Sequence, residues 1–128
     1  MHYKDSYKFG KEQELRVLPV LIEYFKKDIK PYLAQYDKHD LFSDDWNFEV
    51  KSRKVSLACY RDTMITMNKL VGEKPLVLVF NFTDCITYIH YEEELFKTFR
   101  TELFGREGSE EKQHVFIPID KLILIKKW

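Results

Sequence analysis

The 128-residue sequence contains few of the residues that build disulfide scaffolds, zinc sites or membrane spans. Its two cysteines, Cys59 and Cys85, stand in apolar stretches and have no partner at CxxC or zinc-ligand spacing, so we expect both to be reduced, buried thiols. No apolar run approaches the ~18 residues of a membrane span, and the charged N-terminus lacks the apolar core of a signal peptide. These absences predict a soluble, intracellular protein with no membrane partner, inside the host cell if a virus encodes it.

An excess of one charge sign is also missing. Lys+Arg and Asp+Glu each number 21, which gives a formal net charge of zero. A neutral domain does not indicate a nucleic-acid partner as a basic domain does, so any DNA binding must come from local charge clusters or a bound cation. With four glycines, four prolines and no linker-like tract, the chain is expected to form one domain over residues 1–128.

Apolar residues at steps of three and four predict three helices. The first spans about 10–29 and contains Pro19, which is expected to cause a kink or an early break. The second spans about 58–71 and the third 92–104. The face expected to be buried in the second helix consists of Tyr60, Met64, Met67 and Val71.

Other apolar runs predict strands. Residues 76–80 form a continuous run of β-branched and aromatic character, typical of a buried central strand, and a second strand is expected over 86–91. The C-terminal segment predicts a strand up to Ile117 and a strand or helical turn after Pro118. Together with a hairpin before the second helix, the order suggests an α/β fold with a mixed sheet.

The hairpin is predicted over residues 37–54, where turn-forming residues separate two runs of apolar alternation. If Asp44 and Asp45 are the two central residues of the turn, Asp40 lies directly opposite Glu49. Alternation along the strands separates these acids from the core-facing residues. The core-facing side chains of the hairpin are expected to be Leu41, Phe48 and Val50.

Facing carboxylates predict a metal site. Like charges opposite each other destabilise a sheet unless a cation lies between them, and Mg²⁺, or Mn²⁺ in its place, is usually held by one or two carboxylates with phosphate completing the shell. Lys51 shares the face of Glu49 and is placed to orient or deprotonate an attacking water. Glu14 lies along the buried edge of the first helix, so it adds a third acid directed inward, beside Asp40. This combination favours phosphodiester hydrolysis.

Each residue also has an ordinary structural explanation. A Glu-x-Lys pair often belongs to the solvated face of a strand, Glu14 is typical of a helix surface, and Asp37, Asp44 and Asp45 are typical of turns. The histidines lack metal-ligand spacing and receive no catalytic role. They are His39, His90 and His114.

Three segments resemble the PD-(D/E)xK nuclease superfamily, in particular its small Holliday-junction-resolvase-like and phage- or virus-encoded members. They are Gly10-Lys-Glu-Gln-Glu14, Asp40-Leu-Phe and Glu49-Val-Lys51. The resemblance implies a restriction-endonuclease-like core, with a mixed central sheet flanked by helices in the order α-β-β-α-β-β-α-β. It also implies that Glu14, Asp40 and Glu49 bind one or two Mg²⁺ ions and that Lys51 positions or activates water. The proline that names the family is replaced by His39.

The resemblance further implies DNA as the partner, with phosphate contacts from local basic residues. Tyr60 and Lys69 match a spacing found in the viral members. The expected nucleic-acid-binding residues are Lys11, Arg53, Lys54, Tyr60, Arg61 and Lys69.

Three functions follow from this pattern. The first is a magnesium-dependent endodeoxyribonuclease that cuts DNA, including branched DNA such as Holliday junctions. The second is a non-catalytic nucleic-acid-binding or assembly protein on the same fold. The third is cap-snatching RNA cleavage, which usually adds a histidine ligand on the first helix, where this sequence has none. Junction resolvases act as two-fold dimers, so the resemblance also allows a homodimer.

Overall fold

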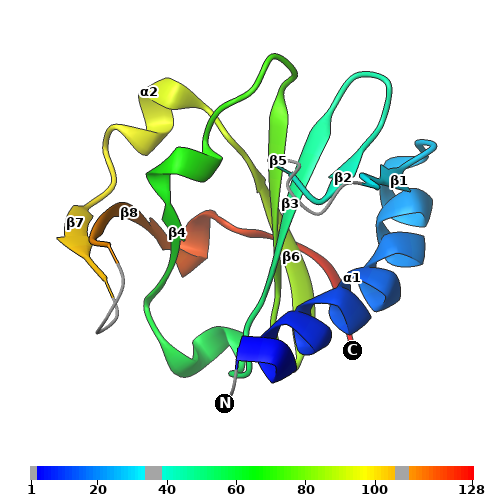
Figure 1. The fold of residues 1–128 in the computed structure, drawn as a ribbon, viewed down its shortest axis with the longest axis horizontal. Coiled ribbons are helices and arrows are strands. Elements are labelled where there is room, and N and C mark those ends of the chain that lie inside the picture. Colours follow the sequence, from blue (N-terminus) through cyan, green and yellow to red (C-terminus); the bar gives the residue numbers. More distant parts are fainter. Residues whose placement is uncertain (1–2, 34–38, 106–109) are drawn as a thin grey trace.

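A computed structural model describes residues 3–33, 39–105 and 110–128 as a mixed α/β fold. Figure 1 shows a long helix beside a larger sheet, with a smaller sheet on the far side. The elements in chain order are α1 (Tyr3–Phe25), β1 (Lys30–Pro31), β2 (Leu41–Phe42), β3 (Asn47–Ser52), η1 (Leu57–Cys59), β4 (Asp62–Thr66), η2 (Met67–Lys69), β5 (Leu76–Asn81), β6 (Cys85–His90), α2 (Glu93–Phe96), β7 (Thr101–Phe104), β8 (Lys112–Pro118), η3 (Ile119–Lys121) and β9 (Ile123–Lys127).

The larger sheet has the strand order β1-β2-β3-β5-β6-β9 within the described residues. β3 and β5 run parallel, whereas every other neighbouring pair is antiparallel. One face of this sheet packs against α1, whose Val17 and Leu21 are fully buried. The sheet residues in that core include Leu41, Phe48, Val50, Val77, Val79 and Ile86.

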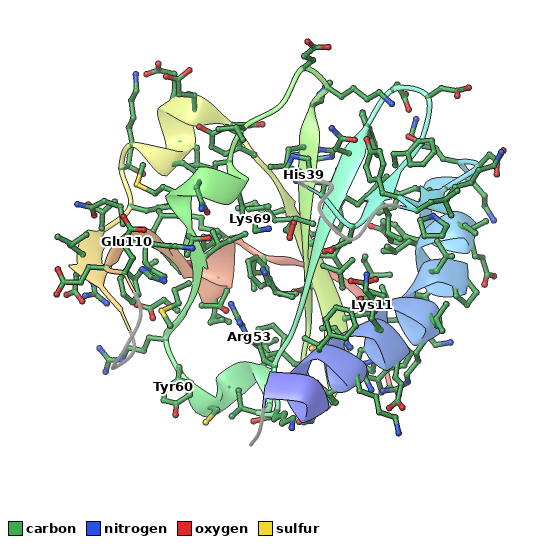
Figure 2. The ribbon with its side chains drawn as sticks, viewed as in Figure 1. Lys11, His39, Arg53, Tyr60, Lys69 and Glu110 are labelled. Atoms are coloured by element: carbon green, nitrogen blue, oxygen red, sulfur yellow. The ribbon has the colours of Figure 1, made fainter. Side chains whose placement is uncertain are left out.

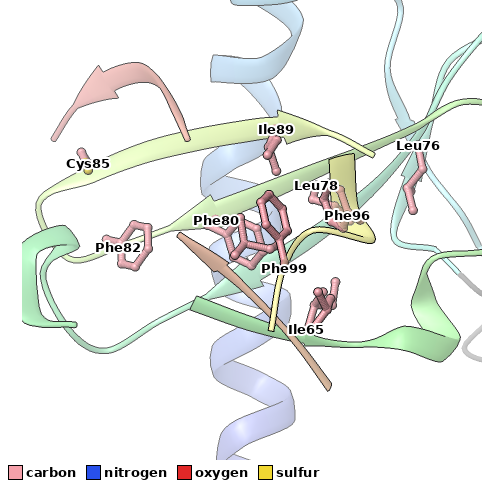
Figure 3. Close-up of a cluster of buried hydrophobic side chains, with 11 residues drawn as sticks. Ile65, Leu76, Leu78, Phe80, Phe82, Cys85, Ile89, Phe96 and Phe99 are labelled. Atoms are coloured by element: carbon pink, nitrogen blue, oxygen red, sulfur yellow. The ribbon is translucent and has the colours of Figure 1, made fainter. Parts of the chain in front are cut away.

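The smaller sheet has the order β4-β8-β7 and covers the opposite face of the larger one. Because β3 and β5 are parallel, residues 53–75 must cross from one end of the sheet to the other. This connection carries β4 into the smaller sheet. Figure 3 shows Leu78 and Phe80 of β5 on the side of β4, in the same buried cluster as Ile65 and Phe99. The two sheets therefore share one apolar core.

Helix α1 begins and ends earlier than expected. It runs from Tyr3 through Pro19 without interruption to Phe25, so the expected break is wrong. Lys26 follows with a left-handed φ of 56°, which ends the helix well before residue 29. Leu15, expected on the buried stripe, is 69% exposed. The buried stripe is therefore rotated from the expected one.

The helix expected over 58–71 is wrong. This segment contains η1, the strand β4 and η2, and in β4 the buried residues are Thr63 and Ile65, which alternate with less buried neighbours. The apolar residues at helical spacing are instead exposed at Tyr60 and Met67, by 65% and 43%. β-branched side chains at a period of two suit a strand, and here they determined the structure.

The helix expected over 92–104 is wrong beyond its first turn. Helix α2 covers Glu93–Phe96 alone, and the segment continues into β7, which pairs with β8. Phe99 is buried as expected, whereas Leu103 is 55% exposed on the outer strand. The expected order α-β-β-α-β-β-α-β is therefore wrong at its second helix and reduced to one turn at its third.

The predicted hairpin is confirmed. Leu41 pairs with Phe48, and the Ser43 N–H donates to the Trp46 carbonyl at 2.9 Å, so the turn has two central residues. Asp37 lies outside the described residues. The strands expected over 76–80 and 86–91, and the strands on either side of Pro118, are also present.

The thiols and the helices bear on two further expectations. Cys85 is buried, but Cys59 is exposed at the end of η1, so the expectation that both thiols are buried is wrong for Cys59. Both cysteines are free. Among the described residues, no helix is long and apolar enough to cross a membrane.

Candidate functional site

The predicted acids meet at the edge of β3, where β2 separates from it. The printed ladder ends with the pair Leu41–Phe48, and the Asp40 N–H donates to the Phe48 carbonyl at 3.1 Å. The Asp40 carboxylate then accepts the Val50 N–H at 2.8 Å. A side chain therefore takes a strand N–H beyond the last backbone pair, which fixes Asp40 beside Glu49.

Glu49 is the most deeply buried acid of the site, with 1% of its surface exposed. Its Oε2 lies 3.7 Å from Lys51 Nζ, and its Oε1 lies 3.7 Å from His39 Nδ1. Both distances exceed those of hydrogen bonds, and Oε1 and Nδ1 each lack a hydrogen-bond partner among the described residues. A buried carboxylate oxygen without a donor is costly, which makes this atom a natural ligand for a cation.

The carboxyl of Asp40 carries the electrostatic effect of this arrangement. Burial, followed by the charges of Glu49 and Glu14, raises its pKa from 3.8 to about 7. The Val50 N–H and the Lys51 ammonium act in the opposite direction but do not outweigh these effects. Glu14, Asp40, Glu49 and Lys51, which come from three parts of the sequence, therefore act electrostatically on one carboxyl group.

Glu14 reaches this region from α1. Its side chain is 16% exposed, and Lys11 one turn earlier donates to its Oε2 at 3.4 Å. Burial lowers the pKa of Lys11, but the carboxylates of Glu14 and Asp40 raise it, and the net shift is upward. Lys11 therefore supplies positive charge at the outer side of the acids.

His39 belongs to the same cluster, although it received no role from the sequence. It is 5% exposed, and its Nε2 lies 2.7 Å from the Val71 carbonyl, to which the ring donates when this nitrogen is protonated. Interaction with Glu49 raises the pKa of His39 against the effect of burial. Gly72, at a φ of +138°, lies so close that an added Cβ would be 3.3 Å from Nε2. The signal for His39 was its place before Asp40, where the resembled family has proline.

The fit to a divalent cation can be tested on these atoms. In the described part of the chain, no three acidic, histidine or cysteine side chains are arranged so that they could hold a metal ion. Mg²⁺ keeps several waters and is usually held by one or two carboxylates, so Asp40 and Glu49 can suffice. The partnerless Oε1 of Glu49 and the repulsion recorded in the Asp40 pKa both fit such an ion. Glu14 would be a further ligand through rotation of its side chain.

The residues expected to bind nucleic acid divide into two groups. Lys11 lies beside the acids, and Lys69 in η2 faces the same region, since its charge lowers the pKa of His39. Arg53 lies between the sheets, where its guanidinium donates to Thr63 Oγ1 and to the Met64 carbonyl. Figure 2 shows Lys69 and Arg53 between β3 and β4, and Tyr60 at the lower end of this region. Lys54, Tyr60 and Arg61 are exposed.

Comparison with known proteins adds no relative. No protein-family model matches the chain, and neither a curated protein nor a solved structure is significantly similar to it.

Proposed function

We propose that this protein is a metal-dependent endonuclease that hydrolyses phosphodiester bonds in DNA, with branched or structured DNA among its substrates. The proposal includes a restriction-endonuclease-like arrangement of α1, β2 and β3, in line with the resemblance to the PD-(D/E)xK superfamily. Mg²⁺, for which Mn²⁺ can substitute, would be held by Asp40 and Glu49, with Glu14 as a further ligand.

One observation carries this proposal. The raised pKa of Asp40 is caused by burial, Glu49 and Glu14, and is opposed by Lys51, so four residues selected from the sequence influence one another through space. Holding like charges together in a partly buried site lowers stability unless a cation compensates them. A site of this kind has a cost that binding of a metal and phosphate would offset.

The side chains divide the chemistry among them. When bound, Mg²⁺ would supply Lewis acidity toward a phosphate oxygen. Lys51, whose Nζ is 3.7 Å from Glu49, would keep an ammonium beside the phosphate and stabilise the charge that grows on it during attack. Asp40 would remain fixed on the edge of β3 by the Val50 N–H. Lys11 would attract a neighbouring phosphate of the same strand.

The test is cleavage of duplex, single-stranded and four-way-junction DNA, and of RNA, with Mg²⁺ or Mn²⁺. We expect Lys51→Ala and Asp40→Asn each to reduce cleavage of DNA by about 100-fold or more, the loss typical of a missing charge-stabilising group. Lys126→Ala on β9 and Asp45→Asn in the hairpin turn are matched controls that keep the activity. No metal-dependent cutting of any substrate, or equal cutting by all four variants, would contradict the proposal.

A non-catalytic nucleic-acid-binding protein on the same fold is the second candidate. The observation that favours it is that Glu49 is almost fully buried and already has two potential cations, Lys51 and His39, within 4 Å. In that case Asp40→Asn would leave DNA binding unchanged, and Mg²⁺ would neither support cleavage nor stabilise the protein.

A further inference from the structure

A hollow of about 340 Å³ opens between the end of β3 and the strand β4, away from the acid cluster. Its volume is at the lower end of the range of about 300–1,000 Å³ found for small-molecule sites. The hollow also borders the end of β5 at Phe82. Its walls are mainly apolar and aromatic, formed by Val55, Leu57, Tyr60, Met64, Phe82, Phe116 and Ile119.

The charged groups of the hollow are unevenly distributed in sign. Arg53 and Lys54 contribute two cations, whereas the one acid of its lining, Asp62, already lies 3.6 Å from Arg100. A second, smaller hollow of about 210 Å³ shares Arg53, Lys54 and Phe82 and continues toward α1, where Arg16 adds a third cation. Apolar and aromatic walls with a cationic rim suit a ligand that has a flat apolar part and an anionic part.

The hollow is aligned with the proposed catalytic site along β3. Side chains of alternate residues point to the same face of a strand, so Glu49, Lys51 and Arg53 follow one another on the face toward the smaller sheet. At about 3.3 Å per residue, Glu49 and Arg53 are roughly 13 Å apart along the chain. A nucleic-acid strand with a phosphate near Glu49 would therefore bring a nucleotide a few steps away to the hollow.

We propose that this hollow binds one unpaired nucleotide of a DNA strand, with its base against the aromatic wall and its phosphate at Lys54 and Arg53. Binding of single strands commonly combines a cationic groove with aromatic side chains on which bases stack. A base within a duplex is stacked and paired, so its faces cannot reach such a wall. The inference rests on the proposed nuclease function for its meaning, because it names DNA with unpaired nucleotides as the substrate class.

Binding without metal tests the inference separately from cleavage. The probe is a fluorescent 12-nucleotide oligo-dT in EDTA, with a duplex of the same length as competitor, followed by fluorescence anisotropy. We expect the single strand to bind more tightly than the duplex, and Tyr60→Ala to weaken it by about tenfold or more. Lys54→Ala should lower the slope of log Kd against log salt by about 0.7.

The controls are matched in residue type. Tyr24→Ala, a partly exposed tyrosine on α1, and Lys126→Ala on β9 should bind like the wild type. Ser56→Phe, which adds a ring inside the hollow, should weaken single-strand binding without removing a cation. Circular dichroism confirms that each variant is folded. Equal binding of single strand and duplex, or unchanged binding of both Tyr60→Ala and Ser56→Phe, would overturn the inference.

Failure of the two proposals can be told apart. If oligo-dT binding depends on Tyr60 but no substrate is cut with Mg²⁺, the nucleotide site stands and the nuclease function fails. If Asp40→Asn abolishes cutting while Tyr60→Ala and Ser56→Phe alter neither binding nor the choice among substrates, the nuclease stands and the nucleotide site fails.

Discussion

The edge of β3 and the smaller sheet bury their residues to opposite effect. At the edge, Glu49 and His39 are both at most 5% exposed, and neither the Oε1 of the one nor the Nδ1 of the other has a hydrogen-bond partner in the described part of the chain. In the smaller sheet the buried residues are apolar, among them Ile65 and Ile117. Burial of apolar groups stabilises a fold, whereas burial of poorly paired charges destabilises it. The difference indicates where this protein gives up stability for a function.

The largest effect should come from the smaller sheet. Ile117 is fully buried, so Ile117→Ala should lower the free energy of unfolding by about 2–5 kcal/mol, measured by urea denaturation. The matched control is Leu103→Ala on the neighbouring strand β7, which is 55% exposed and should change stability by less than about 0.5 kcal/mol. Similar losses in both variants would mean that the smaller sheet does not form part of the core.

The next effect concerns the acids at the edge of β3. If Asp40 and Glu49 share a cation, Mg²⁺ at a hundred times its Kd should stabilise the wild type by about 2.7 kcal/mol. For a domain of this size, the melting temperature should rise by roughly 10 °C. The shift should persist in Asp45→Asn, which alters an exposed turn acid, and disappear in Asp40→Asn. Equal shifts in the two variants would remove Asp40 from the metal site.

The smallest of the three effects is the pH dependence of stability without metal. The folded pKa of Asp40, about 7, lies above its unfolded value of 3.8, so the folded state binds more protons between these values. Stability due to this group is therefore greatest below about pH 4 and falls as the pH rises toward 7. Asp40→Asn should remove this fall and be about 2 kcal/mol more stable than the wild type at pH 8 in EDTA.

Urea unfolding of both proteins at pH 5 and pH 8 measures this difference. His39, whose pKa is also raised, loses its stabilising contribution as the pH rises, but it does so in both proteins. A stability difference that stays constant between the two pH values would show that burial and the neighbouring acids do not perturb Asp40.

The hairpin was predictable because local residues determine it. Asp44 and Asp45 favour a turn, and a two-residue turn fixes the register of every residue around it, including Asp40 and Glu49. The prediction that these acids would lie together with Lys51 required no knowledge of the remaining fold. Their chemistry stays a prediction, since the described structure contains no ion or substrate.

The smaller sheet was not predictable in the same way. Tyr60, Met64 and Met67 happen to follow a helical spacing, whereas the pattern that matters, Thr63 and Ile65 at a period of two, covers two buried residues. β4 exists because it pairs with β8, about 50 residues later, and local sequence carries no information on that partner. The role of His39 was hidden for the same reason, because Val71 and Gly72 reach it from another part of the chain.

The connection between β3 and β5 also sets how the chain can come apart. It places β4 in one sheet between two neighbouring strands of the other, and β4 finds its partner only in β8. Neither sheet is a contiguous piece of sequence, so neither can be excised as a fragment or fold to completion before the other. We therefore expect the protein to unfold in one cooperative step, slowed by long-range pairing, with no stable state that keeps the acid cluster and loses the nucleotide-sized hollow.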